Sequence, residues 1–91
     1  MTTRHAPSPA VVEKAGRYVA EGRVALDYAD DEMCMALVRG SSDLAYTVQH
    51  IPSAGWRCSC PANRFQARTC AHILATWHQC PDLPDPTKET A

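Results

Sequence analysis

The stretch from residue 56 to residue 77 contains the most informative motif of this chain. It begins Trp56-Arg57-Cys58-Ser59-Cys60-Pro61, continues through a polar link, and ends Thr69-Cys70-Ala71-His72-Ile73-Leu74-Ala75-Thr76-Trp77. Two cysteines stand two residues apart, and after nine intervening residues a cysteine and a histidine stand two apart. Three sulfurs and one imidazole form a complete tetrahedral donor set for zinc.

The spacing of the four residues predicts where each one lies. On a strand, positions i and i+2 point to the same face, so Cys58 and Cys60 can reach one ion. Two residues along a helix correspond to a rotation of about 200°, so Cys70 and His72 cannot both lie in mid-helix. We therefore expect Cys70 at a helix start, where free N–H groups favour a thiolate, and His72 in the first turn.

A single structural zinc ion is the interpretation that this pattern favours. An iron–sulfur cluster and a disulfide with two bystanders are the alternatives, but strand and helix signals flanking the motif favour zinc. Four protein ligands leave no position for water, so the sequence argues against zinc catalysis. We expect sulfur–zinc distances of about 2.3 Å and a nitrogen–zinc distance of about 2.0–2.1 Å.

The same residues resemble the SWIM-type zinc finger family, whose signature is Cys-x-Cys, a variable link and Cys-x-His. The motif covers about a quarter of the chain, and the Cys-Ser-Cys-Pro run and the apolar residues after His72 match the family closely. The resemblance implies a ββα core around zinc and a role in binding DNA or protein. One departure is Ala71, a position that is often lysine in the family.

The length and composition of the chain describe one small domain. Its 91 residues bury a modest core, and small domains of this kind commonly need a staple such as a metal. Five cysteines, an odd number, fit a disulfide framework poorly. The first nine residues contain no apolar run and no stretch approaches a membrane span, so we expect an intracellular, cytoplasmic protein (nuclear if eukaryotic) without membrane contact.

Hydrophobic periodicity and turn residues predict two helices and several strands. Ser8-Pro9 is typical of a helix start, and an apolar stripe predicts a helix over 9–21, ended by Gly22. Strands are expected over 24–28, 33–39, 44–50 and 56–58, with the second and third forming an antiparallel hairpin. A last helix is expected from residue 69 or 70 to 79, ended by Cys80-Pro81.

These elements predict a small α+β domain. It contains an N-terminal helix, an antiparallel sheet of two to four strands and a zinc-clamped ββα finger. We expect a disordered arm over 1–7, one domain over 8–80 with the finger motif at 56–79, and a disordered, proline-rich tail over 81–91. Cys34 is expected in the core and Cys80 as a free thiol, with a redox or dimer role as its alternative.

The distribution of charge suggests where a partner would bind. No Asp or Glu occurs from residue 44 to residue 81, although the net charge of the whole chain is −1. The candidate partner-binding residues are Arg57, Arg64, Phe65 and Arg68. The alternative is a solvated link with Phe65 in the core. So few arginines predict that any DNA affinity is weak and steeply dependent on salt.

The function expected from the sequence is a non-catalytic zinc-binding module, a small adaptor or regulator that acts through protein or nucleic-acid interaction. A DNA-binding protein proper is the alternative, and a thiol redox protein is a more remote one. No paired carboxylates, Ser/His/Asp set or glycine-rich phosphate loop indicates an enzyme or a small-molecule substrate.

Overall fold

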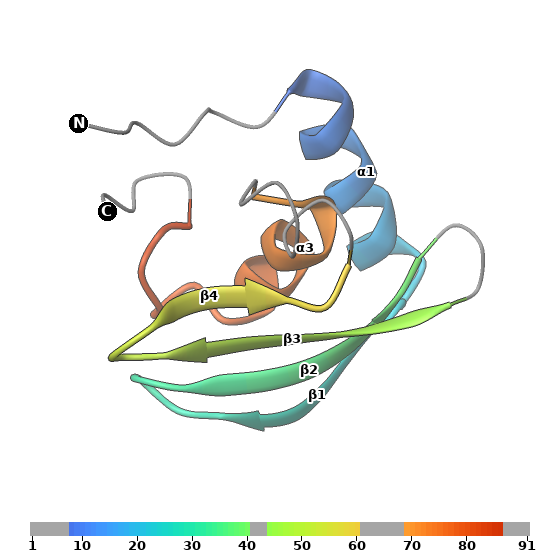
Figure 1. Ribbon diagram of the computed structural model, residues 1–91. Coiled ribbons are helices and arrows are strands. Elements are labelled where there is room, and N and C mark those ends of the chain that lie inside the picture. The colour runs from blue at the N-terminus through green and yellow to red at the C-terminus, as the bar shows by residue number, and fades with distance from the viewer. Residues whose placement is uncertain (1–7, 41–43, 61–68, 87–91) are drawn as a thin grey trace.

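A computed structural model of the chain describes residues 8–40, 44–60 and 69–86, and it shows an α+β fold (Figure 1). Its elements, in chain order, are α1 (Pro9–Ala20), β1 (Val24–Ala29), β2 (Cys34–Arg39), β3 (Ala45–Ile51), β4 (Gly55–Cys58) and α3 (Ala71–Gln79). The four strands form one antiparallel sheet in the order β1-β2-β3-β4. The fold class expected from the sequence is confirmed.

Helix α1 has the start that the sequence predicts. The Ser8 side chain accepts a hydrogen bond from the Val11 N–H at 3.3 Å, and Pro9 occupies the first turn, where a missing N–H costs nothing. After the helix, Gly22 adopts a φ of 68°, a left-handed conformation that glycine reaches without steric cost. The helix ends at Ala20, one residue before the predicted end.

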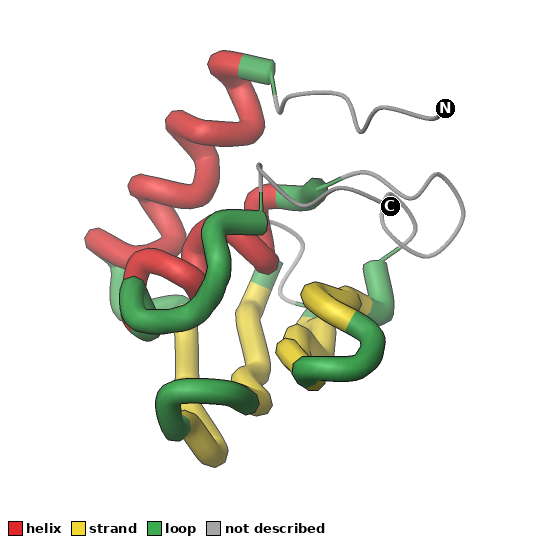
Figure 2. The backbone as a smooth tube through the Cα atoms, turned by 90° about the vertical axis from the view of Figure 1, so that its left-hand side faces the viewer, coloured by secondary structure: helices red, strands yellow, loops and turns green. Residues whose placement is uncertain are grey.

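The sheet has one covered face and one open face, because both helices lie on the same side (Figures 1 and 2). Alternation along β2 makes this plain: Cys34, Ala36 and Val38 are buried, whereas the residues between them are exposed. The side of the sheet that carries Met35 and Leu37 is called the open face below. Strand pairing adds cross-strand neighbours to it from β1, β3 and β4.

Helix α3 lies over the covered face of the sheet and packs against both the sheet and α1. It contacts all four strands and α1, and Ile73, Leu74 and Ala75 are buried in the core. Ala15 and Tyr18 are the buried residues of α1. This packing positions the first turn of α3 beside the end of β4 (Figure 1).

The segment that follows α3 differs from the sequence expectation. The composition predicts disorder from residue 81 onward, but residues 81–86 pack against the domain, with Leu83 and Pro86 buried. The Trp56 and Trp77 indole N–H groups donate to the Pro84 and Leu83 carbonyls at 2.8 and 2.9 Å. Two indole donors and one leucine thus anchor a proline-rich segment. Residues 1–7 and 87–91, for which disorder is also predicted, lie outside the described residues.

Candidate metal centre

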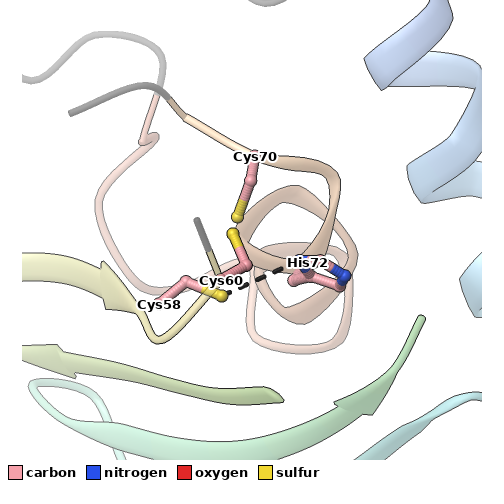
Figure 3. Close-up of side chains that lie close together, drawn as sticks. All are labelled: Cys58, Cys60, Cys70 and His72. Atoms are coloured by element: carbon pink, nitrogen blue, oxygen red, sulfur yellow. Dashed lines mark hydrogen bonds between the residues drawn. The ribbon is translucent and has the colours of Figure 1, made fainter. Parts of the chain in front are cut away.

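The end of β4 and the start of α3 bring the four predicted ligands together (Figure 3). Cys58 is the last residue of β4, and Cys60 follows two positions later. Cys70 is the N-cap of α3 in an extended conformation, and His72 lies in the first turn. The expected placement of Cys70 at a helix start is confirmed, and its extended backbone reconciles the Cys-x-His spacing with a single site.

The four donor atoms are close enough for one ion. All lie within 4.8 Å of one another, and the Cys58 Sγ and His72 Nδ1 atoms are 3.8 Å apart. A tetrahedral zinc site with bonds of about 2.0–2.3 Å has donor–donor edges of about 3.3–3.8 Å. The cluster therefore has the composition of a Cys3His zinc site and needs to contract by at most about 1.5 Å to have its dimensions.

The cluster is shielded from solvent, which affects thiol ionisation. Cys58, Cys60 and Cys70 are buried, and His72 is half-buried. Hydrogen bonding to Cys58, together with burial, raises the pKa of Cys70 to about 12. The metal-free cluster therefore holds the Cys70 proton at neutral pH, and a divalent cation would have to displace it to gain a thiolate ligand.

Three residues that the sequence did not assign to the site hold the His72 ring. Tyr18 of α1 stacks on the imidazole with a centroid distance of 5.6 Å and an interplanar angle of 12°. Tyr46 of β3 lies at 4.8 Å, tilted by 44°. Gly40 faces the ring, since a Cβ there would lie 3.3 Å from Nε2. The imidazole is thus oriented by one residue from α1, one from β3 and one from the end of β2.

Only periodicity and turn signals point toward these three residues. Tyr18 belongs to the apolar stripe of the first helix, Tyr46 alternates along the third strand, and Gly40 opens the predicted turn. Each pattern indicates a core or turn position without naming what the residue contacts. The contact with His72 depends on the helix-on-sheet packing, which residue spacing does not specify.

The candidate partner-binding residues are only partly covered by the structure. Arg57 is exposed on β4 and lines a shallow hollow of about 260 Å³ with Thr47, Gln49, Cys58 and Ser59. Arg64, Phe65 and Arg68 lie outside the described residues. Arg57 therefore sits directly beside the ligand Cys58, on the opposite face of β4.

The other two cysteines lie apart from the metal cluster. Cys34 is buried, as predicted, and Cys80 is a free thiol, as predicted, that is also buried. Burial, and to a smaller extent the charge of the neighbouring Cys80, raises the pKa of Cys34 to about 11. Burial likewise raises the pKa of Cys80. Within the described residues, the group that could hold a metal comprises Cys58, Cys60, Cys70 and His72 and includes neither of these thiols.

Two further histidines of the domain have separate environments. His50 is buried, pairs across the sheet with Cys34, and places its Nδ1 atom 2.8 Å from the Glu32 carbonyl oxygen. It therefore binds backbone rather than the metal cluster. His78 is exposed near the end of α3, away from the ligand positions in the first turn.

Comparisons of the chain with models of protein families, with curated proteins and with solved structures find no match. No helix in the described part of the chain is long and apolar enough to cross a membrane. The resemblance to SWIM-type fingers therefore rests on the motif residues alone.

Proposed function

We propose that the chain is a non-catalytic, SWIM-type module in which one structural zinc ion is held by Cys58, Cys60, Cys70 and His72. The observation that carries this proposal is the convergence of these four donors within 4.8 Å in a buried cluster. Softness and geometry both favour zinc, because three sulfurs and one imidazole match its structural sites. When bound, the ion supplies a cross-link between β4 and α3.

The metal's role in this proposal is to hold a surface together. Cys58 and Cys70 lie on either side of a chain segment that the ion would close, so metal binding contributes directly to folding free energy. His72 meets both Tyr18 and Tyr46, so the same ion also fixes the contact between α1, α3 and the sheet. The module would then act by presenting the surface around residues 56–79 to a macromolecular partner.

A protein partner is the first candidate and a nucleic acid the second. The observation that favours a nucleic acid is the lack of Asp and Glu from residue 44 to residue 81, combined with an exposed Arg57. Three thiolates and Zn²⁺ sum to a formal charge of −1, which offsets part of the arginine charge. The small number of cations predicts weak, salt-sensitive binding, so protein contact remains first.

Thiol redox chemistry is less well supported than metal binding. A reactive cysteine is normally a partly exposed thiolate with a lowered pKa. Cys34 and Cys80 are buried, and the pKa of each is raised by that burial. Neither thiol matches the environment of a nucleophilic cysteine.

A mobility-shift titration of the zinc-loaded protein tests the class of partner. If a nucleic acid is the partner, mixed-sequence DNA or RNA should shift at micromolar protein in low salt, and the shift should weaken steeply with added salt. The matched variant is Arg57→Gln, which removes one charge from the exposed face of β4. No shift at low salt, followed by partner capture with zinc-loaded but not zinc-stripped protein, would support the protein candidate.

A further inference from the structure

On the open face of the sheet, the β1–β2 half carries large apolar side chains and ends at Arg39, whereas the β3–β4 half carries Thr47, Gln49 and Arg57. The β1–β2 half is called the apolar half below. Pairing places Ala25, Leu37 and Thr47 in one row, and Tyr28, Met35, Gln49 and Arg57 in the next. Three large side chains on the apolar half are substantially exposed: Tyr28 by 54%, Leu37 by 50% and Met35 by 40%. Exposed apolar groups clustered on one face are typical of an interaction surface.

Tyr28 projects from one end of this apolar half. The register shift between Leu26 and Tyr28 forms a bulge, which turns Tyr28 onto the open face opposite Met35. Its hydroxyl donates to Asp30 Oδ2 at 2.6 Å. Asp30 also accepts from the Glu32 and Met33 N–H groups, and these bonds, led by the one from Tyr28, lower the pKa of its carboxyl group. The end of β1 thus presents an aromatic ring next to an ionised carboxylate.

A hollow of about 530 Å³ lies at the other end of the same two strands. Ala25, Leu37 and Ala45 supply apolar walls, and the small alanine side chains leave the space beside Leu37. The lining also includes Glu21, Gly22, Arg23 and Arg39. Glu21 binds Arg23 at 2.6 Å, so the charges of that pair offset one another and Arg39 adds a basic group at the hollow. The volume is sufficient for an aromatic side chain.

We propose that the open face docks against the open face of a second copy of this chain, with Tyr28 of each copy entering the Ala25–Leu37 hollow of the other. A two-fold axis that runs across the strands, between the two rows, produces this arrangement. It places Met35 against Leu37 of the second copy and stacks the apolar halves on each other. The interface is isologous, since projection and hollow lie on the same surface.

Charge along the strands is complementary in the same arrangement. The basic end of the apolar half carries Arg39, and the opposite end carries the acidic turn Asp30-Asp31-Glu32. Antiparallel superposition brings each Arg39 to the acidic turn of the second copy. A two-fold axis parallel to the strands would instead set the apolar half against Thr47, Gln49 and Arg57, so the crossing axis is favoured.

The size of the face predicts a weak dimer. Four strands about 4.8 Å apart and about six residues long span roughly 15 by 20 Å. This is smaller than the roughly 800 Å² per partner of a standard stable interface. We therefore expect a dissociation constant on the order of 10–100 µM. Aligned packing of two sheets at about 10 Å would leave room for Tyr28 to bridge the faces.

Sedimentation equilibrium of the zinc-loaded chain, in reductant so that cysteines cannot cross-link, tests this inference. Over about 5 µM to 1 mM the average mass should rise from the monomer mass of 10.0 kDa toward twice that value. Leu37→Glu should weaken association at least ~tenfold, because it would bury a carboxylate at the centre of the interface. The matched control is Val12→Glu, which changes an equally exposed valine on α1 and should dimerise like the wild type.

A charge exchange tests the orientation. Arg39→Glu and Asp31→Arg should each weaken the dimer several-fold, and the double variant should regain most of the loss. Circular dichroism and zinc content report whether each variant remains folded. A wild-type chain that stays monomeric at about 1 mM overturns the proposal outright. So does a dimer that is unaffected by Leu37→Glu and Arg39→Glu in folded protein.

Discussion

The Nε2 atom of His72 faces Gly40 so closely that a Cβ on Gly40 would lie 3.3 Å away from it. The Tyr18 and Tyr46 rings also pack against the imidazole, with centroid distances of 5.6 and 4.8 Å, so the ring has little room to move away. Because Nδ1 on the other side of the ring points to Cys58, any displacement of the ring moves a metal-binding atom. The end of β2 therefore sets the position of a ligand that belongs to α3.

We expect Gly40→Ala to weaken metal binding. Overpacking beside a ring costs about 1 kcal/mol or more, and disturbance of groups around a ligand commonly reduces metal affinity by about 10-fold. Competition with a chelator measures the affinity. Gly16→Ala is the matched control, because a Cβ at Gly16 meets no atom within 4 Å. Equal zinc affinity in the two variants would contradict the role given to Gly40.

Loss of one ligand should unfold the finger. Cys58→Ser or His72→Ala removes one metal–ligand bond from a site in which metal binding is worth about 10–16 kcal/mol. Because that free energy contributes to folding, the amides of residues 56–79 should lose their protection against hydrogen exchange. Hydrogen exchange and thermal unfolding measure the loss. His78→Ala, on the exposed side of the same helix, should leave both unchanged. Full thermal stability in either ligand variant after loss of metal would refute a structural role for the ion.

Metal affinity should rise with pH. The Cys70 pKa is raised from 9.0 to about 12 in the folded metal-free chain, so zinc binding near neutral pH must release that proton, and acidification opposes it.

The free energy of unfolding of the metal-free chain should change with pH in the opposite direction and fall as the pH rises. A raised folded pKa favours the folded state below about pH 9 and loses that contribution as the pH rises toward 12. Chelator competition at several pH values and alkaline unfolding of metal-free protein measure the two effects, and an affinity independent of pH would contradict them.

The segment after α3 should contribute to stability. Leu83 is only 3% exposed, and its removal from the core should cost about 2–3 kcal/mol. Chemical denaturation of Leu83→Ala measures this cost. Leu44→Ala, which truncates a leucine that is 60% exposed, is the control and should change stability by less than about 0.5 kcal/mol. Similar losses in the two variants would show that residues 81–86 do not pack as described.

Local patterns in the sequence predict most of the fold and the whole set of candidate ligands. Ser8 and Gly22 bound the first helix, an apolar run identifies β2, alternation identifies β3, and Cys-x-Cys with Cys-x-His identifies the four donors. Each of these signals lies within a few residues, where spacing translates directly into direction. The predicted ends of the helices and strands coincide with the observed ones or differ from them by at most two residues.

The features that the sequence does not predict all depend on long-range packing. Proline-rich composition after residue 80 suggests disorder, because no local pattern shows that the Trp56 and Trp77 donors meet the carbonyls of residues 83 and 84. The same holds for Gly40, which reaches His72 only when α3 covers the sheet. Projection of Tyr28 onto the open face requires the bulge in β1, which shifts the alternation by one residue.

The intact mass of the chain under native and denaturing conditions shows whether the folded protein binds one zinc ion. We expect a native mass that exceeds the denatured mass by one zinc ion, with all five cysteines reduced in the denatured protein. Cys60→Ser and His72→Ala should lose the ion, and Cys34→Ser should keep it. A native mass without metal, or a denatured mass reduced by a disulfide within the Cys58, Cys60 and Cys70 set, would rule out a structural zinc ion held by these residues.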